Sequence, residues 1–512
     1  MIEENKSSMK NSVRRLVIAG IGVLIQIIWV VVLVMRLNQY SQIITLLTVA
    51  IELVLVLAVY SMDTNAAFKL PWIILITVAP IVGICVFFLF GRSGATKKVR
   101  TRYRKIDQQL FAYLNQDEQI IDELSKKDER LANDFKYLWK CASSPVYKNT
   151  DVKYYGDTCD AMAAQLEDMM QAKQFIFLEY HAIEMAESFQ ALRKVLMAKA
   201  REGVEIRILY DDAGCIGFLN PRFIKYMESM GIQCRVFNPI MPVLNIFMNN
   251  RDHRKITVID GRVAYTGGYN LADEYFNITH PYGQWKDSGI RFEGDAVQTA
   301  TILFLEMWNA LKEQDVDIEK YLPVYPYKAK EQGFFALYGD SPLDKEPAGE
   351  NVYMNLLRHA KKYIYFTTPY LILSDEMTRE LTGAAKRGVD VRIITPGIPD
   401  KKTIFQVTKS YYPQLLKHGV KIYEYTPGFM HEKQCICDGE IVVVGTINLD
   451  FRSLYLHFEN AALFCGYEAV SHVKEDFDAL FPICKDMSKE PSERTRRLRL
   501  SQLILRLFSP LM

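Results

Sequence analysis

Few cysteines and no excess of charge of either sign are the first features of this 512-residue chain. The nine cysteines include no pair with CxxC spacing, and Cys435-x-Cys437 near His431 offers too few ligands for a usual zinc site. Lysine and arginine total 62 against 60 aspartate and glutamate, a net charge of +2. This balance excludes a strongly basic nucleic-acid-binding protein, and the 49% hydrophobic content excludes a disordered chain. A mean hydropathy of −0.03 is typical of a soluble protein.

That average hides apolar runs near the N-terminus. Leu16–Met35 and Leu70–Phe90 carry no charge, and Ile43–Tyr60 between them carries one, Glu52. About 20 apolar residues cross a bilayer, so residues 1–92 are predicted to form a membrane anchor with two or three transmembrane helices. A cleaved signal peptide is the alternative for the first run, but the run is longer than the apolar core of a typical signal peptide.

Basic residues flanking these runs indicate the orientation. Seven cations follow closely after Phe90, and lysines and arginines also precede the first run. Basic flanks stay in the cytoplasm. Three spans cannot place both flanks there, so either the N-terminus lies outside or the Glu52 segment is re-entrant. We expect a multi-pass protein of the cell membrane, with residues 93–150 as a basic helical connector and the remainder on the cytoplasmic side.

The rest of the chain is a duplication of strands and helices. The expected strands are Ile176–His181, Gly203–Asp211 and Gly231–Phe237 in the first copy, and Ile364–Tyr370, Gly388–Ile394 and Gly419–Tyr425 in the second. Strands alternating with helices predict an α/β fold with a largely parallel sheet in each copy. We expect a first repeat over 151–320, a linker rich in proline and glycine over 321–350, a second repeat over 351–490 and a basic amphipathic tail over 491–512.

One residue pattern, H-x-K-x4-D with a later asparagine, occurs in both copies at a constant offset of 178 residues. Its members are His253, Lys255, Asp260 and Asn270 in the first copy, and His431, Lys433, Asp438 and Asn448 in the second. A chain with only eight histidines is not expected to repeat such a pattern in register by chance. The pair is therefore a strong functional signal.

The spacing suits chemistry on a phosphodiester. Residues two apart on a strand share a face, so each histidine projects with its lysine, and a glycine turn brings the asparagine beside them. If the two copies face each other, the cations and amides can bind the non-bridging oxygens. One imidazole can then attack phosphorus while the other protonates the leaving oxygen. Nothing in the sequence indicates a metal or other cofactor, so we expect a nucleophile from the protein.

Each imidazole also needs an acidic partner that fixes its tautomer. Asp287 and Glu459 lie similarly downstream of the two motifs and are expected to orient the histidines. Asp260 and Asp438 precede glycine, which is typical of a turn at the end of a strand, and we interpret them as structural members of the motif. The remaining histidines are expected to be surface or core groups: His181, His280, His359, His418, His457 and His472.

The paired motifs resemble those of the phospholipase D superfamily, and the surrounding sequence is similar to the bacterial cardiolipin synthases. The resemblance runs from about residue 43 to the end and rests on Asn250–Ile256, Tyr265–Tyr275, Thr367–Tyr370, Gly445–Ser453, Phe90–Arg92 and Ser509–Met512. It implies two tandem phospholipase D-like α/β/α repeats packed as a pseudo-dimer after N-terminal transmembrane helices. The chain departs from the family's usual Asn-Phe-Glu at His457.

The resemblance also implies phosphatidyl transfer, in which two phosphatidylglycerols give cardiolipin and glycerol through a phosphohistidine. His253 is expected to be the nucleophile and His431 the acid and base. The expected partners are phosphatidylglycerol and anionic membrane lipid rather than nucleic acid. The basic, apolar segment Arg494–Phe508 is expected either to lie on such lipid or to pack as a core helix. Three other functions stay open: a membrane-bound phospholipase D-type hydrolase, a nuclease and an inactive scaffold.

Overall fold

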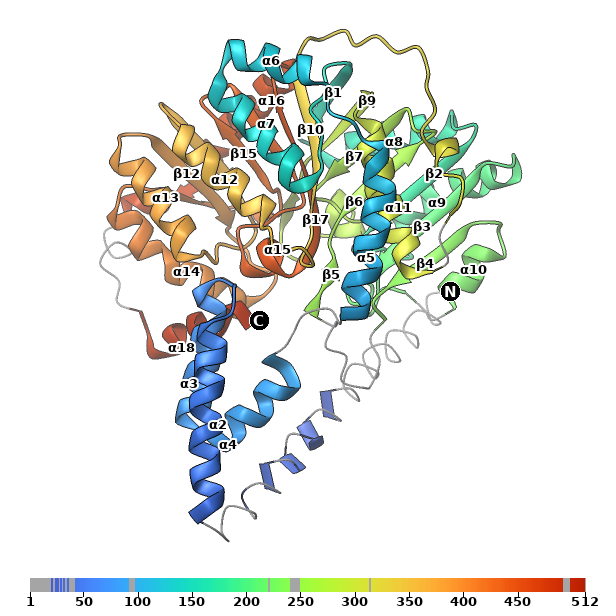
Figure 1. Cartoon of the computed structure of the whole chain (residues 1–512). Coiled ribbons are helices and arrows are strands. Elements are labelled where there is room, and N and C mark those ends of the chain that lie inside the picture. Colours follow the sequence, from blue (N-terminus) through green and yellow to red (C-terminus); the bar gives the residue numbers. More distant parts are fainter. Residues whose placement is uncertain are drawn as a thin grey trace.

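A computed structural model describes residues 42–91, 97–219, 222–239, 249–312, 315–490 and 498–511, together with single positions between 20 and 35. Much of the first apolar run, Leu16–Met35, therefore lies outside the described residues. Two α/β units lie side by side, and helices α2 to α4 project from one end of the pair (Figure 1). Both predicted repeats of strands and helices are thus present.

The first unit is built on a seven-stranded sheet in the order β1-β9-β7-β6-β2-β3-β4. Its strands are β1 Thr150–Tyr155, β2 Phe175–Tyr180, β3 Glu205–Asp211, β4 Gln233–Phe237, β6 Lys255–Ile259, β7 Val263–Gly267 and β9 Gly289–Gly294. The helices are α8 Thr158–Met170, α9 Glu187–Arg201, α10 Phe223–Glu228 and α11 Val297–Leu311. All six residues of β2 are buried, because alternate side chains pack against α8 and α9 on one face and against α11 on the other.

The second unit repeats this plan. Its strands follow the order β10-β17-β16-β15-β11-β12-β13-β18. They are β10 Phe334–Asp340, β11 Tyr363–Thr367, β12 Asp390–Pro396, β13 Lys421–Tyr425, β15 Gln434–Cys437, β16 Ile441–Gly445, β17 His457–Cys465 and β18 Cys484–Asp486. The covering helices are α12 Ala348–His359, α13 Asp375–Lys386, α14 Lys402–Lys417 and α16 Glu468–Leu480. The predicted strands of both copies are confirmed to within about three residues at each end.

The expected largely parallel sheet is wrong for half of each unit. Only β2, β3 and β4, and their counterparts β11, β12 and β13, run parallel, whereas the strands after each motif histidine form antiparallel pairs. The cause is a three-residue loop that begins with Asp-Gly, with φ of 53° and 62° at Asp260 and Gly261 and of 54° and 72° at Asp438 and Gly439. Such a turn reverses the chain at once, and parallel neighbours need a longer crossover.

Two connecting segments also differ from the expectation. The predicted linker, residues 321–350, contains β10, which pairs along its whole length with β17. The predicted basic helical connector, residues 93–150, contains α5 (Lys97–Leu110), α6 (Glu118–Lys127) and α7 (Glu129–Ala142), and each of these helices buries an apolar face. Most of their charged residues lie on the outer faces, Asp134 being buried beside His359, so these helices belong to the body of the protein.

The second and third apolar runs form a helical hairpin. The second is α2 (Gln42–Tyr60), and the third is divided into α3 (Ala66–Val78), α4 (Pro80–Val86) and a π-helical turn η1 (Phe87–Gly91). The division falls at Ala79, because a residue before proline avoids the helical conformation. Within the described ranges, no helix is both long and apolar enough to cross a bilayer.

The two units are joined through backbone pairing as well as through a shared core. The short strand β5 (Arg251–Asp252) of the first unit pairs with the start of β17 in the second. Reciprocally, β14 (Gly428–Met430) of the second unit pairs with β8 (Gln284–Lys286) of the first. Each motif histidine directly follows one of these exchanged strands, so the pairing places it at the junction between the units.

Candidate active site

Both motif histidines line one cavity of about 440 Å³ between the two units. Its walls come from both repeats and from the C-terminal turn. The lining residues are His181, Ala213, Arg251, His253, Asn270, Tyr275, Trp285, Tyr370, Ile372, Asp400, Lys401, Ile404, Phe429, His431, Asn448, Asp450, Phe451, Arg452, His457 and Ser509. Of the predicted convergence of two imidazoles, two ammoniums and two amides on one pocket, the imidazoles and amides line this cavity and the two lysines do not.

Each motif histidine is oriented by a carboxylate from the opposite repeat. His253 Nδ1 lies 2.8 Å from Glu459 Oε2, and His431 Nδ1 lies 2.6 Å from Asp287 Oδ2. The backbone amide of each histidine also donates across the junction, to the carbonyls of Phe458 and Lys286, both at 2.8 Å. With Nδ1 engaged, the Nε2 atom of each ring is the one available for chemistry in the cavity.

The motif lysines are buried against their own histidines. Lys255 Nζ donates to the His253 carbonyl at 2.7 Å, and Lys433 Nζ contacts both the His431 carbonyl and His431 Nδ1. Neither lysine is among the described lining residues of the cavity. Burial lowers the pKa of Lys255 to about 8 and that of Lys433 to about 7. Both ammonium groups are therefore close to losing their protons near neutral pH.

Burial raises, rather than lowers, the pKa of Asp287, the acid beside His431. The Asp287 pKa rises to about 7, although Lys433 opposes the shift. Burial, followed by the two motif lysines, holds the pKa of His253 and of His431 well below 6.5. Both imidazoles are thus neutral at pH 7 in the free site, which suits a nucleophile and a base.

The two asparagines lie at equivalent places after their glycine turns. Asn270 accepts a hydrogen bond from the Ala182 amide at 3.0 Å and donates to the Tyr275 hydroxyl at 2.8 Å. Asn448 lines the cavity with its side-chain oxygen unpaired among the described residues. The structure therefore places both predicted amides beside the histidines.

The motif aspartates lie at the far ends of the strands and hold backbone turns. Asp260 accepts hydrogen bonds from three consecutive amides, those of residues 173 to 175, at 2.7 to 2.8 Å. Asp438 binds the amides of residues 361 to 363 in the same way. Each carboxylate thus fixes the start of the strand that neighbours its motif, which agrees with the structural interpretation of these residues.

Two histidines that the sequence placed on the surface or in the core line the cavity instead. The rings of His181 and His457 lie 5.0 and 5.5 Å from that of His253. His457 sits two residues before Glu459 on β17, so the strand period could have identified it. No comparable sequence signal marked His181, whose ring is placed by a 2.7 Å contact from Nδ1 to the Asp252 carbonyl.

His457 links an arginine to the carboxylate that orients His253. Arg452 Nε donates to His457 Nε2 at 3.3 Å, which leaves the ring hydrogen on Nδ1. That Nδ1 lies 3.5 Å from Glu459 Oε1, and neither atom has a hydrogen-bond partner among the described residues. Burial lowers the pKa of His457 to about 3, so the ring is neutral and has one donor and one acceptor.

The walls around the two motif histidines differ. Aromatic rings surround His431, with Trp285, Tyr275 and Phe429 at 5.1, 5.2 and 5.8 Å between ring centres. Imidazoles surround His253. Trp285 precedes Asp287 by two residues, as His457 precedes Glu459, so equivalent positions hold an indole in one copy and an imidazole in the other.

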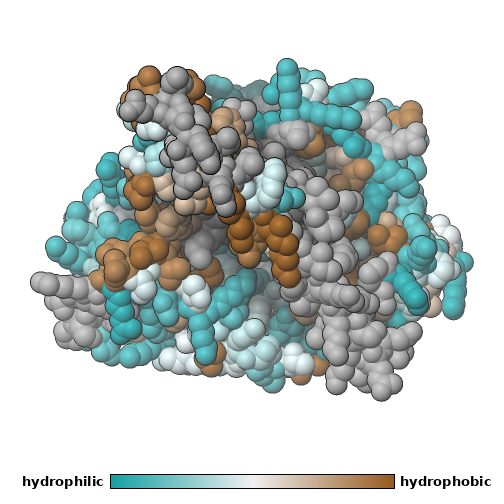
Figure 2. Space-filling view, turned by 90° about the horizontal axis from the view of Figure 1, so that it is seen from below, coloured by the Kyte–Doolittle hydropathy of each residue, from teal (hydrophilic) through white to brown (hydrophobic). Residues whose placement is uncertain are grey.

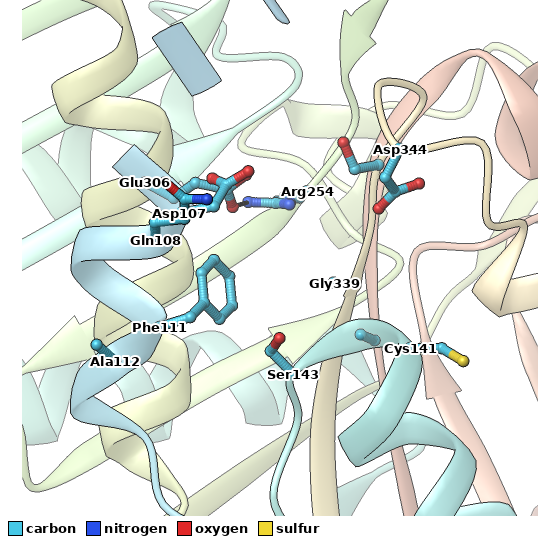
Figure 3. Close-up of a pocket in the computed structure, with 12 residues that line it drawn as sticks. Asp107, Gln108, Phe111, Ala112, Cys141, Ser143, Arg254, Glu306, Gly339 and Asp344 are labelled. Carbon is cyan, nitrogen blue, oxygen red and sulfur yellow. Dashed lines mark hydrogen bonds and ion pairs between the residues drawn. The ribbon is translucent and has the colours of Figure 1, made fainter. Parts of the chain in front are cut away.

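A second cavity of about 340 Å³ is lined by residues of α5, α7, α11 and β10 (Figure 3). Arg254, between the first histidine and lysine, points into it and pairs with Glu306 at 2.8 Å, beside Asp107. Arg254 also donates from Nε to the Glu459 carbonyl at 3.3 Å. The buried Arg254–Glu306 pair therefore stabilises β17, the strand that carries Glu459.

Within the described parts of the chain, one cluster has the composition of a metal site. The ligand atoms of His253, His457 and Glu459 lie within 4.8 Å of one another. Glu459 Oε2 already accepts hydrogen bonds from His253 and from the Thr446 hydroxyl. Cys435 and Cys437 are buried in β15 as free thiols.

Comparison with known proteins places the duplicated region in one family. The family model described as cardiolipin synthase, PLD-like domain, matches residues 166–308 and 353–481. An uncharacterized protein of Streptococcus mutans is 39% identical over 90% of this chain and 99% of its own length. Proteins named cardiolipin synthase from Halalkalibacterium halodurans and cardiolipin synthase 2 from Bacillus anthracis are 32% and 30% identical, each over 86% of this chain. These alignments cover 87% and 86% of the two relatives.

A solved structure shares the fold. The phosphatidylserine synthase of Haemophilus influenzae aligns with a TM-score of 0.52 over 70% of this chain and 93% of its own. The sequence identity is 13%, so this likeness concerns the fold alone.

Proposed function

Because the chain belongs to the cardiolipin synthase family of phospholipase D-like proteins, we propose that it joins two phosphatidylglycerol molecules into cardiolipin and releases glycerol. It is accordingly a phosphatidyltransferase. The observation that carries the proposal is that two imidazoles, each oriented by a carboxylate of the other repeat, line the same cavity. Two such groups supply a nucleophile and an acid–base on either side of one phosphorus.

In the first step, His253 Nε2 attacks the phosphorus of one phosphatidylglycerol. A nitrogen–phosphorus bond forms and the bond to the glycerol oxygen breaks, while protonated His431 gives its proton to that oxygen. The products are phosphatidyl-His253 and free glycerol. The anionic phosphate favours protonation of His431, whose pKa is lowered in the free site mainly by burial.

In the second step, the terminal hydroxyl of another phosphatidylglycerol attacks the same phosphorus. His431 takes the hydroxyl proton, the new oxygen–phosphorus bond forms and the bond to His253 breaks. Cardiolipin leaves, and both histidines return to their starting states. Glu459 and Asp287 hold the two rings, since each accepts from the Nδ1 of one of them.

The motif lysines and asparagines are proposed to stabilise the phosphate. Lys255 and Lys433 place two positive charges behind the imidazoles, where they offset the charge of the non-bridging oxygens. Asn270 and Asn448 line the cavity and offer amide groups to the same oxygens. Buried charges act strongly here, because the surroundings screen them poorly.

We further propose that residues 1–92 anchor the protein in the cell membrane by two or three spans, with the repeats on the cytoplasmic side. The outer faces of α2 and α3 support this, since their apolar side chains are exposed: Leu46 72%, Leu53 64%, Leu57 60%, Leu70 52% and Val78 79%. Apolar side chains also gather on the end of the molecule where these helices project (Figure 2). The basic start of α5 would meet anionic lipid headgroups.

Product analysis with the purified full-length protein tests the proposed function. Incubation with phosphatidylglycerol vesicles should yield cardiolipin and glycerol in equal amounts, as measured by mass spectrometry and a glycerol assay. Release of phosphatidic acid instead would identify a hydrolase. A catalytically silent His253→Ala preparation controls for contaminating activity, and the absence of any lipid turnover by the intact protein would refute the proposal.

A further inference from the structure

Part of the wall of the catalytic cavity is apolar, because three of its lining residues belong to one hydrophobic cluster, and the C-terminal turn contacts this part. Ile372, Ile404 and Phe451 line it, together with Ser509, which begins the final turn η8 (Ser509–Leu511). Ile372 follows β11, Ile404 lies in the first turn of α14, and Phe451 opens α15 (Phe451–Tyr455) directly after the second motif. Ser509 is only 4% exposed, so the start of η8 is part of the cavity wall.

The C-terminal helix is held firmly in this place. The helix α18 (Leu500–Phe508) packs against α14, where the Arg506 guanidinium lies 4.0 Å from the centre of the Tyr411 ring. Gln502 Nε2 donates to the Gln406 carbonyl at 3.4 Å. The Ser509 hydroxyl donates to the Arg506 carbonyl at 2.8 Å, which caps the helix beside the cavity. These contacts hold Ser509 in its position in the cavity wall.

The same wall is continuous with apolar surface outside the cavity. The Phe68 ring of α3 meets the Phe451 ring at 5.6 Å, so the N-terminal hairpin packs directly behind the cavity wall. Helices α3 and α18 also touch, and α18 exposes Leu500, Leu503 and Ile504 at 74%, 48% and 50%. Figures 1 and 2 show α18 at the end from which the hairpin projects, and apolar side chains on that face.

We propose that this wall binds the acyl chains of the phosphatidyl group that the two histidines hold by its phosphate. The inference rests on the proposed function, because it takes a lipid phosphodiester as the substrate. In the proposed mechanism the phosphate is held between the two imidazoles, so the diacylglycerol part of the bound lipid must extend along another wall of the cavity. The wall of Ile372, Ile404, Phe451 and Ser509 has the matching apolar character, and it leads toward the surface that we propose to contact the bilayer.

The experiment fills this part of the cavity with an indole. Ser509→Trp is compared with Ser501→Trp, which places the same side chain on an exposed position of the same helix. Each full-length protein is assayed on dioleoyl-phosphatidylglycerol and on dibutanoyl-phosphatidylglycerol, whose chains barely leave the headgroup. We expect Ser509→Trp to lower the ratio of kcat/KM for the long-chain lipid to that for the short-chain lipid at least tenfold, and Ser501→Trp to leave this ratio unchanged.

The outcomes separate this inference from the proposed function. An unchanged ratio in a folded Ser509→Trp protein would overturn the acyl-chain wall while leaving the transfer reaction intact. A wild-type protein without activity on either lipid would overturn the proposed function itself. If Ser509→Trp lowers the melting temperature strongly, Ile404→Trp replaces it, since Ile404 is half-buried in the first turn of α14 and opens onto the same wall. The same tenfold change is then required.

Discussion

Replacement of His457 by alanine should slow the reaction although this residue is outside the repeated motif. The His457 ring accepts a hydrogen bond from Arg452 and lies against Glu459, and Glu459 in turn orients His253. In the other repeat, Asp287 receives the equivalent second contact from the Ser288 amide at 2.9 Å. Removal of His457 takes away the donor nearest Glu459 Oε1, an atom with no hydrogen-bond partner among the described residues.

The magnitude follows from the loss of this polar contact at 3.5 Å, about 0.5–1.5 kcal/mol. If this loss falls on the transition state, kcat/KM drops by about 2- to 10-fold. Because His457 acts through His253 rather than through ground-state binding, kcat and kcat/KM should fall together. His457→Asn should recover most of the activity, since its amide keeps a donor near Glu459 and is the residue that the family usually has at this position.

The assay is initial-rate formation of cardiolipin from phosphatidylglycerol in mixed micelles. His472→Ala is the matched control, because His472 has a side chain that is 46% exposed on α16 of the same repeat. Thermal melting of each variant shows whether the fold is kept. The reasoning is refuted if folded His457→Ala reaches wild-type kcat/KM, or if His457→Asn is no more active than His457→Ala.

Four further expectations concern the motif residues. His253→Ala and His431→Ala should each abolish cardiolipin formation; product detected by mass spectrometry at a wild-type rate in either would contradict the two-histidine mechanism. Alanine at either motif lysine should lower kcat by about 100-fold, on the order of 3 kcal/mol, in the same assay. Because burial lowers the lysine pKa values to about 8 and 7, loss of their protons should lower kcat as the pH rises from 6 to 9, and a flat profile would speak against their role. Asp260→Ala and Asp438→Ala should each unpair three amides and destabilise the fold by about 3 kcal/mol, read as a lower Tm by scanning fluorimetry; unchanged melting would exclude the turn-holding role.

The sequence was informative wherever local spacing determines geometry. The strand period placed His253 and Lys255 together, and the duplication predicted that His431 would face the first histidine. Glycine after Asp260 identified a strand-end turn, which the positive φ of 53° at Asp260 confirms. These features depend on neighbours within a few residues, so a single sequence can reveal them.

Features that depend on contacts between the repeats could not be read in this way. Asp287 and Glu459 were expected to orient the histidines, but the crossed pairing follows from β5 joining β17 and β14 joining β8. The position of His181 in the cavity depends on the Asp252 carbonyl, which the chain reaches only after folding. The strand β10 was hidden in a stretch rich in proline, glycine and charge, although Phe334–Tyr338 is wholly buried.

The exchange of short strands between the repeats means that neither repeat carries a complete reaction centre. The first contributes one imidazole and the carboxylate that serves the other, and the second does the same in return. The two halves of the gene are therefore under joint selection. A substitution at Glu459 alters the orientation of the His253 ring, some two hundred positions away in the chain. Fragments expressed separately should be inert alone and regain activity only when mixed, as would be expected of a protein descended from a symmetric homodimer whose subunits became fused.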